Sequence, residues 1–468
     1  MTGTGQDGRE RDDPEAVAVV EEDYSLATEL IYEVEAALDE NDLDKVQDLI
    51  EPLHVADVAD LLEYLTKDER RLLIEAQWSV MEPEVLVHLD AGIREEVIEQ
   101  IGRKELARAL SALDSDDAVD VFEDLDEEAQ HRILSSLPQA YRHLLEESLS
   151  YPEDSAGRLM QREMVVIPST WTVGQTIDFM RSDEDLPDDF YDLFIVNPKH
   201  KPIGAVPLSR VLRTKRPVKI SDLMAAEIRP VSVTMDQEQV AFLFRQYDLA
   251  SAPVVSEDGR LVGVITHDDV LDVVDEEAEE DLMRLGGVTG TDLYRAAIDT
   301  TRSRFPWLVV NLATAIVASI VIGFFEATIQ QIVALAVLMP IVASMGGNAG
   351  TQTLTVAVRA LAMKELTASN ALRIVGKEAL VGGFNGLLFA VLVGIVAWLW
   401  FASPDIGIVI AAAMAINLVV AGLAGVAIPI GLERTGIDPA VASVVLLTTI
   451  TDVVGFAVFL GLAALFLI

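Results

Sequence analysis

Apolar residues recur every three to four positions through the first part of this chain, which is the spacing of amphipathic helices. Between about residues 25 and 150 this pattern comes in short stretches of similar length. Short helices of similar size, each with one apolar face, predict an all-α helical-repeat domain, an α-solenoid, over residues 25–150. We expect its aspartates to be solvated surface charges rather than metal ligands, including Asp57, Asp60, Asp116 and Asp120.

A second pattern occurs twice. Residues 159–163 and 223–227 begin alike, and each start is followed by an extended run, a helix, a buried strand, a turn and another strand. This order, closed by a further helix, predicts a compact pair of α/β domains at residues 151–216 and 217–275.

An acidic segment follows the repeat. One helical stripe holds Asp269, Asp272, Glu276 and Glu280. Like charges four residues apart destabilise an isolated helix. Either solvent and salt screen these charges, which is the commoner case, or a divalent cation neutralises them, and carboxylate oxygens suit Mg²⁺ or Ca²⁺. Paired glycines at residues 286 and 287 break this helix, and it resumes at residues 293–304 up to the membrane, so residues 276–304 are expected to be an acidic connecting helix with a break.

The last third of the chain holds five apolar segments, each long enough to cross a bilayer as a helix. They are residues 306–325, 330–361, 380–401, 407–432 and 440–468. Basic residues occur only before the first segment, from the end of the second segment (Arg359) to the start of the third, and between the fourth and fifth segments. The positive-inside rule then predicts a five-helix transmembrane domain, residues 305–468, in the cell membrane, with a cytoplasmic N-terminus and an external C-terminus.

The second apolar segment is unusual because Pro340 and the pair Gly346 and Gly347 interrupt it. Such residues predict a broken helix, and freed carbonyl groups at membrane depth are tolerated only beside a cavity or other protein. Asn348 and Gln352 add polar side chains to this segment, and Asn417 adds another in the fourth. Close packing of helices on small residues explains the glycines equally well.

The fifth segment carries Asp452 near its middle. An aspartate at that depth costs about 2.5–3.5 kcal/mol on insertion scales, so it normally faces a bundle interior or a water-filled path. On a helix Thr448, Gly455 and Phe456 share its face. We interpret this face as the wall of a cation pathway; the alternative is a protonated aspartate with a structural hydrogen bond.

Charged residues are unevenly distributed along the chain, which has 468 residues and a net charge of −42. Residues 305–468 hold five basic and seven acidic residues, which leaves 29 and 69, a net charge of −40, for residues 1–304. This field excludes nucleic acid as a partner and attracts cations. Adaptation to high salt and binding of metal ions are both explanations for this excess of acidic residues. Residues 1–24 read as a disordered acidic tail, and the absence of cysteine excludes thiolate metal sites.

The second repeat copy, from Ser251-Ala252-Pro253 to Thr266-His267-Asp268-Asp269, resembles the CBS domain. The resemblance implies that the pair binds an adenine nucleotide such as ATP in its cleft, with Thr266 and Asp269 at the ribose. The first copy departs from the pattern at residues 207–210, so at most one nucleotide site is expected. A structural role for Thr266 is an equal alternative.

The order of all these parts is similar to the MgtE family of magnesium channels. So are the run P-x5-G-G-N-x-G-x-Q at residues 340–352, Gly436-Ile437-Asp438-Pro439, and Thr451-Asp452-Val453-Val454-Gly455. The resemblance implies a homodimer with Asp452 in a pore on its two-fold axis. It implies that the connecting helix is a plug, closed by cytoplasmic Mg²⁺ at Asp269, Asp272, Glu277, Glu280 and Asp438.

With that resemblance, a pathway for hydrated Mg²⁺ is expected to be lined by Gly346, Gly347, Asn348, Gln352, Asn417 and Thr448 around Asp452. A secondary divalent-cation exchanger could use the same residues, although the five unequal segments show no inverted repeat. An intramembrane aspartyl protease needs two embedded aspartates, and only Asp452 qualifies, so we expect no enzyme.

Overall fold

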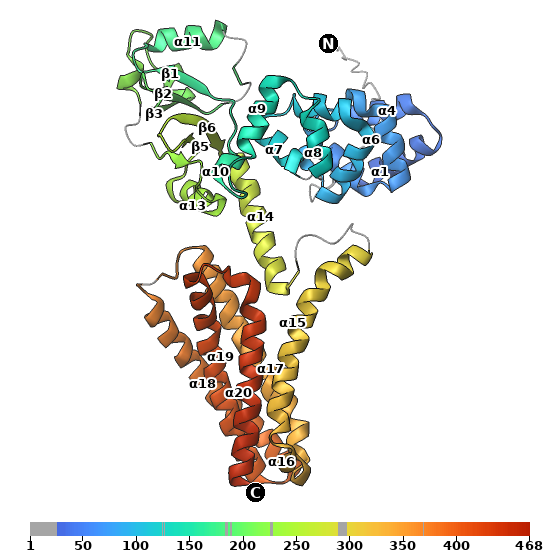
Figure 1. The fold of residues 1–468 in the computed structure, drawn as a ribbon, viewed down its shortest axis with the longest axis vertical. Helices are drawn as coiled ribbons and strands as arrows, with labels where there is room; N and C mark the ends of the chain where they lie inside the picture. The colour runs from blue at the N-terminus through green and yellow to red at the C-terminus, as the bar shows by residue number, and fades with distance from the viewer. Residues whose placement is uncertain are drawn as a thin grey trace, which may run out of the picture. The chain divides into compact units, whose positions relative to one another are not determined.

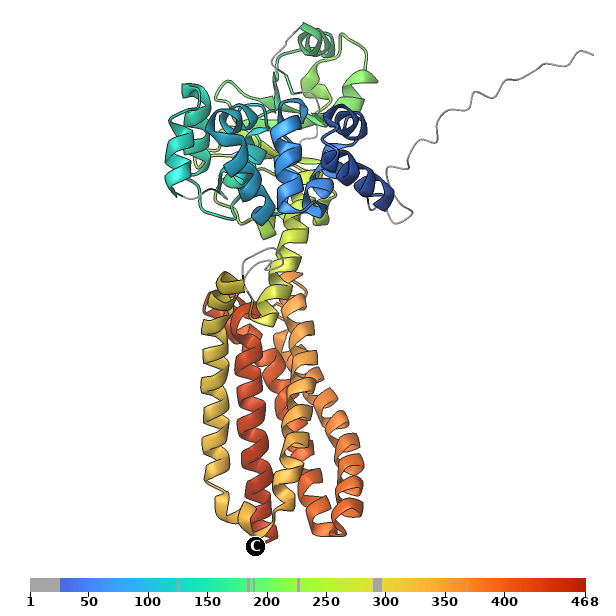
Figure 2. The same cartoon turned by 90° about the vertical axis from the view of Figure 1, so that its right-hand side faces the viewer.

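The computed structural model describes residues 26–468 except 124, 126, 183–185, 188–189, 225–227, 289–296 and 368. Contacts between residues divide the chain into two compact units, Met1–Val274 and Asp275–Ile468. Figures 1 and 2 draw the folds of both units. The acidic tail expected at residues 1–24 lies outside the described residues.

The first unit begins with short helices that share one apolar core, as the spacing of apolar residues predicts. In the described residues these are α1 (Thr28–Asp39), α2 (Leu43–Ile50), α3 (Val55–Tyr64), α4 (Lys67–Gln77), α5 (Val85–His88), α6 (Ala91–Leu110, two short helices that meet at a kink at Gly102), α7 (Ser115–Glu123), α8 (Glu127–Leu134) and α9 (Gln139–Ser148).

Two buried arginines, 24 residues apart, each join a helix to the end of the helix before it. Arg70 donates to the carbonyls of Leu62 (2.7 Å) and Leu65 (3.0 Å) at the end of α3, and Arg94 donates to the carbonyls of Val87 and Leu89 at the end of α5. The last carbonyls of a helix have no partner within it, so each guanidinium satisfies the end of the preceding helix. The repeated use of this contact supports a helical-repeat architecture.

The two repeat copies fold into two three-stranded sheets with the same topology, which confirms the α/β pair. In each sheet the first strand is parallel to the second and the second antiparallel to the third. The elements are α10 (Ala156–Leu159), β1 (Val165–Pro168), α11 (Val173–Ser182), β2 (Asp192–Val196), β3 (Pro202–Pro207) and α12 (Leu208–Leu212), then β4 (Val231–Ser232), α13 (Gln237–Tyr247), β5 (Ser251–Val255), β6 (Leu261–Thr266) and α14 (His267–Gly286).

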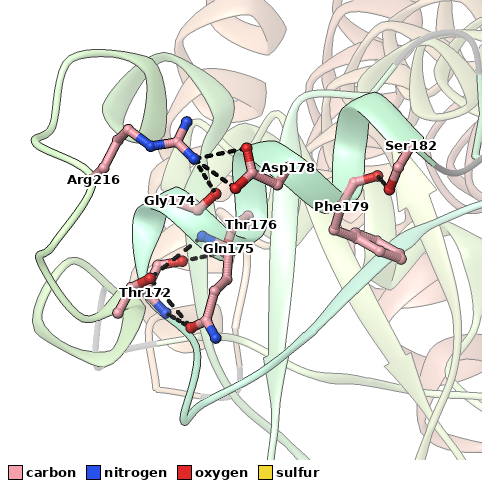
Figure 3. Close-up of polar contacts among 8 residues, drawn as sticks. All are labelled: Thr172, Gly174, Gln175, Thr176, Asp178, Phe179, Ser182 and Arg216. Carbon is pink, nitrogen blue, oxygen red and sulfur yellow. Dashed lines mark hydrogen bonds and ion pairs between the residues drawn. The ribbon is translucent and has the colours of Figure 1, made fainter.

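Local hydrogen bonds fix where α11 begins (Figure 3). The Thr172 amide donates to Gln175 Oε1 (2.9 Å), and the Gln175 amide donates to Thr172 Oγ1 (3.3 Å). This reciprocal pair is a capping box, which satisfies amides that the first turn leaves unpaired. Arg216 binds Asp178 one turn further along (2.7 Å) and so ties α11 to the segment that leads into the second copy.

The second unit holds five helices that are long and apolar enough to cross a membrane, in agreement with the sequence prediction. They are α15 (Ala297–Gly323), α17 (Ala334–Ala362), α18 (Ala371–Phe401), α19 (Pro404–Arg434) and α20 (Pro439–Phe466), with the short α16 (Glu326–Gln331) after α15. Of these spans α19 is the most buried, and it packs against α17, α18 and α20.

The prediction that the second segment is broken is wrong. α17 is one helix across Pro340, Gly346 and Gly347. Gly346 lies against the Asn417 side chain, and Gly350 lies against Leu447. The small residues therefore serve close helix packing, and in a continuous helix the carbonyls near Gly346 stay in its hydrogen-bond ladder instead of opening to a cavity.

Candidate ion pathway and acidic sensor

Asp452 is the one carboxylate near the middle of α20, and it is half-buried. No hydrogen bond or ion pair joins it to any other described residue, so a structural hydrogen bond does not explain it. One turn earlier, the Thr448 hydroxyl donates to the carbonyls of Val444 (3.0 Å) and Val445 (3.1 Å). Because that proton is used, the lone pairs of Thr448 can accept from another donor.

α17 has two opposite faces. One is buried in the bundle and contains Gly346, Gly350 and the apolar residues Leu335, Leu338, Val342 and Leu354. The other is polar and exposed on the isolated chain, and we call it the polar stripe: Ser344, Asn348, Gln352 and Thr355. A polar stripe in a membrane span requires protein or water beside it rather than lipid.

The exposed face of α18, unlike the polar stripe of α17, is apolar. Its large side chains are apolar and more than half exposed: Leu380 (65%), Phe384 (69%), Leu387 (63%) and Leu388 (69%). Such a face suits lipid, since lipid chains offer no hydrogen bonds. The five-helix unit therefore presents two chemically different surfaces.

Contacts between α17 and α20 fix their register. The Asn417 side chain lies against both Gly346 on α17 and Gly455 on α20, and Gly350 lies against Leu447. Residue numbers rise along α17 as they fall along α20, so the helices are antiparallel. This register places Asn348 and Asp452 within about one helical turn of the same depth.

The other predicted pathway residues divide into two groups. Gly347 has open space where a side chain would stand, and Gln352 is exposed. Asn417 is 0% exposed and Gly346 is buried against it. In the single chain these last two residues face the packed interior instead of an open surface.

An acidic cluster lies inside the first unit, where α7 meets the start of α14. Burial, together with the charge of Asp269, raises the pKa of Asp116 well above its usual value. Burial also raises the pKa of Asp117 to about 7, with the charges of Asp114 and Asp269 adding to it. One oxygen of Asp116, Oδ1, is buried without a hydrogen-bond partner among the described residues. The expectation that Asp116 is a solvated surface charge is therefore wrong.

Asp269 and Thr266 have a clear local role. The Thr266 amide and hydroxyl both donate to Asp269 Oδ2 at 2.8 Å, which caps the start of α14. The cavity that reaches Thr266 has a volume of about 160 Å³. A larger cavity of about 790 Å³ lies between the two CBS-like copies and is lined by Phe190, Ser209, Arg229 and Tyr247 among others. Only the larger one has the 300–1,000 Å³ typical of ligand pockets.

At the other end of α14, within the second unit, Arg284 binds both Glu280 and Asp438. Asp438 also caps α20, since its Oδ1 accepts from the Ala440 amide (2.7 Å). Burial, followed by the charges of Asp438 and Glu277, raises the pKa of Asp281 beside them. Two predicted metal ligands are thus brought together, with a guanidinium between them.

Two further sensor positions, Asp272 and Glu277, lie along α14, exposed and half-buried respectively. Across the described residues, no three histidine, aspartate or glutamate side chains converge closely enough to hold a metal ion.

Similarity to known proteins identifies the family of this chain. A family model described as "Divalent cation transporter" (MgtE) matches residues 339–462, the MgtE intracellular N domain matches residues 53–154, and the CBS domain matches residues 220–276. The magnesium transporter MgtE of Thermus thermophilus is 32% identical over 449 residues, which cover 94% of this chain and 99% of that protein. The chain belongs to the MgtE family. The magnesium transporter MgtE of Bacillus subtilis is 31% identical over 374 residues, or 79% of this chain and 82% of that protein.

Among solved structures, the cytosolic domain of the Mg²⁺ channel MgtE in complex with ATP is similar to 52% of this chain. The sequences are 28% identical, the match covers 99% of that structure, and the TM-score is 0.49.

Within this MgtE-family chain, sequence reasoning missed three residues. Arg284 follows an acidic run, and its i+4 spacing from Glu280 was a usable signal. The sequence contains no signal for Asp117, since the burial of its side chain depends on how the parts of the first unit pack. Glu378 was placed before the third span, but α18 includes it, and its side chain is 13% exposed and accepts from Thr353 Oγ1 (3.4 Å).

Proposed function

We propose that this chain is a homodimeric channel in the cell membrane that imports Mg²⁺ and closes when cytoplasmic Mg²⁺ binds its acidic helices. The family is one of divalent cation transporters, and the relatives named above are magnesium transporters. In this proposal the first unit and α14 lie in the cytoplasm, and the C-terminus lies outside.

The common depth of Asn348 and Asp452 carries the proposal. The Asn348 side chain is exposed on the single chain, the Asp452 side chain is half-buried, and both lie in the membrane-spanning part of the bundle. A second copy beside the polar stripe would cover it and bring two aspartates to one axis. Two carboxylates in low dielectric attract a dication strongly.

Oxygen acceptors suit Mg²⁺ as the transported ion. Mg²⁺ gives up its water reluctantly, and the bound waters are hydrogen-bond donors. The Asp452 carboxylate, the Asn348 amide oxygen and the Thr448 hydroxyl oxygen are all acceptors. A pathway lined by them recognises the hydrated ion one water away, without stripping it.

Closure by Mg²⁺ follows from the two acidic clusters. Asp116, Asp117 and Asp269 repel one another at one end of α14, and Asp281, Glu277 and Asp438 do so at the other. A bound dication relieves this repulsion and favours the conformation that holds the carboxylates together. Low Mg²⁺ then favours separation and an open pore.

Flux into liposomes tests both parts. Asp452→Asn keeps the shape of the side chain but removes the charge, and we expect Mg²⁺ influx to fall at least about tenfold. The control Asp405→Asn removes a charge at the start of α19 and should conduct normally. Glu277→Ala with Glu280→Ala should conduct but ignore Mg²⁺ on the cytoplasmic side. Normal conduction by Asp452→Asn would refute the pathway.

The dimer has its own test, because the chain contains no cysteine. Ser344→Cys places a thiol on the polar stripe, and Leu387→Cys places one on the apolar face of α18. Oxidation in membranes should link two copies through the first thiol only. A disulfide between copies through Leu387→Cys alone would place the interface on α18 and refute the proposed dimer.

An exchanger is the second candidate, and Glu378 is the observation in its favour. The Glu378 carboxylate is 13% exposed, accepts from Thr353 of α17 and pairs with Lys377, and such a carboxylate could carry a coupling proton or ion. Influx that depends on a proton or sodium gradient, and that Glu378→Gln uncouples from it, would favour exchange over a channel.

The cleft of about 790 Å³ is our choice for an adenine nucleotide. Arg229 stacks on the Tyr247 ring at 3.5 Å, and Phe190 and Leu249 supply apolar surface for a base. ATP binding to the full chain should weaken with Tyr247→Ala and persist with Thr266→Ala.

A further inference from the structure

Asn417 is a polar side chain in the middle of the apolar unit. It is 0% exposed, and its Nδ2 donates to the Val342 carbonyl of α17 at 3.0 Å. Its other polar atom, Oδ1, is buried and accepts no hydrogen bond from the described residues. The amide thus joins α19 to α17 with only one of its two polar atoms hydrogen-bonded.

Two glycines make room for this amide. A Cβ added to Gly346 would overlap Asn417 Nδ2, and one added to Gly455 would stand 2.9 Å from the same atom. Gly346 comes two residues before Asn348, and Gly455 comes three residues after Asp452. The amide therefore occupies the space between α17 and α20 at the depth where the pathway residues lie.

Stability does not account for this arrangement. A buried acceptor without a partner destabilises the fold, and an apolar side chain of the same size would remove that cost. Departures from the best packing are expected where function requires them.

We propose that Asn417 is a positioning residue: it sets the separation and register of α17 and α20 and so the placement of Asn348 relative to Asp452. This inference rests on the proposed pathway. Because the amide contacts no open surface, it acts on the transported ion only through the two helices. Selectivity among divalent ions depends on that placement, since ligand number and spacing separate Mg²⁺ from Ca²⁺.

The test compares Asn417→Ala with Met414→Ala, a fully buried apolar residue less than one turn earlier on α19. Each variant is measured in liposomes for the ratio of Mg²⁺ to Ca²⁺ influx and in detergent for its melting temperature. We expect Asn417→Ala to change the ratio about three- to thirtyfold. Met414→Ala should keep the ratio and melt at a temperature at least as low.

A second pair of variants keeps the proposal falsifiable if Asn417→Ala folds poorly. Gly346→Ala alone should lower the melting temperature because the new methyl group collides with the amide. Adding Asn417→Ala should restore the melting temperature and leave the flux ratio altered.

The proposal is overturned if Asn417→Ala keeps the ratio of the control, or if the double variant recovers normal selectivity together with stability. Asp452→Asn separates this outcome from failure of the pathway itself: a channel that needs Asp452 but tolerates Asn417→Ala refutes only the positioning role.

Discussion

Replacing Arg284 with glutamine should make the connecting helix respond to less Mg²⁺. The Arg284 guanidinium binds Glu280 and Asp438, two of the carboxylates expected to bind the regulatory ion. A guanidinium and a Mg²⁺ ion cannot both occupy the space between these oxygens. In the proposed regulation, the arginine is therefore a tethered cation that Mg²⁺ must displace.

The size of the effect follows from exposure. The side chains of Arg284, Asp438 and Glu280 are 34%, 32% and 43% exposed, so solvent screens both ion pairs. Pairs of this kind contribute about 0.5–1 kcal/mol each. Mg²⁺ no longer has to break two of them in Arg284→Gln, a gain of about 1–2 kcal/mol. The midpoint of Mg²⁺ binding should fall about five- to thirtyfold.

Trp307 offers the readout, because its indole packs against Gly287 at the end of α14. Tryptophan fluorescence of the full chain is titrated with Mg²⁺, and the same titration of Trp307→Phe is subtracted. Arg284→Lys keeps the charge but not the fork that reaches two carboxylates, so its midpoint should lie in between. Arg302→Gln removes one charge from α15 as a control. Equal midpoints for Arg284→Gln and Arg302→Gln would refute the displacement.

Three further outcomes are expected. Arg94→Ala should destabilise the first unit by about 2–4 kcal/mol, because it leaves the Val87 and Leu89 carbonyls unpaired and breaks the ion pair with Asp120 (2.7 Å). Calorimetry should show a clearly lower melting temperature for this variant and an unchanged one for Arg71→Ala, which removes an exposed arginine. The raised pKa of Asp117 means that the folded state holds its proton more tightly than the unfolded state, so the free energy of unfolding without Mg²⁺ should fall as pH rises from about 4 to about 7 and then level off. Over the same pH window Mg²⁺ should bind more tightly, because the carboxylate loses its proton. Asp117→Asn should flatten both curves. Gly287→Ala should destabilise the chain by about 1–2 kcal/mol or more, since φ is +70° and the methyl group displaces the Trp307 indole. Gly431→Ala lies in the helix α19 with open space around it, so it should keep or slightly raise the melting temperature in the same assay.

Periodicity predicted most of the fold because it reports burial directly. The repeat copies, the helical domain and the five spans each follow from where apolar residues recur, and the glycine pair ending α14 follows from its backbone freedom, with Gly287 at a positive φ. The broken second span was the main error. Pro340 and the glycines carry the same local signal whether a helix opens or packs closely, and only the neighbours of Gly346 and Gly350 distinguish the two.

The site was less predictable for a related reason. Asp452 and the polar stripe could be found from the sequence, because a polar residue inside an apolar run is a local signal. Asn417 was found too, but its burial between two glycines was not, since three separate helices create it. Asp116 looks like any surface aspartate until α7 packs against α14, and Arg284 is one charge in an acidic run until α20 brings Asp438 to it.

The burial of particular carboxylates bears on why the first 304 residues carry a net charge of −40. Acidic residues that adapt a surface to salt need to be exposed, because dissolved ions screen exposed charges well and buried ones poorly. Asp116, Asp117 and Asp281 do not fit that description: burial raises the pKa of each, and other carboxylates lie close to them. Repulsion among such groups destabilises the folded chain unless a bound cation offsets it. Salt adaptation therefore suits exposed acidic residues but does not explain these two clusters, and it is there that a divalent ion would change the conformation most.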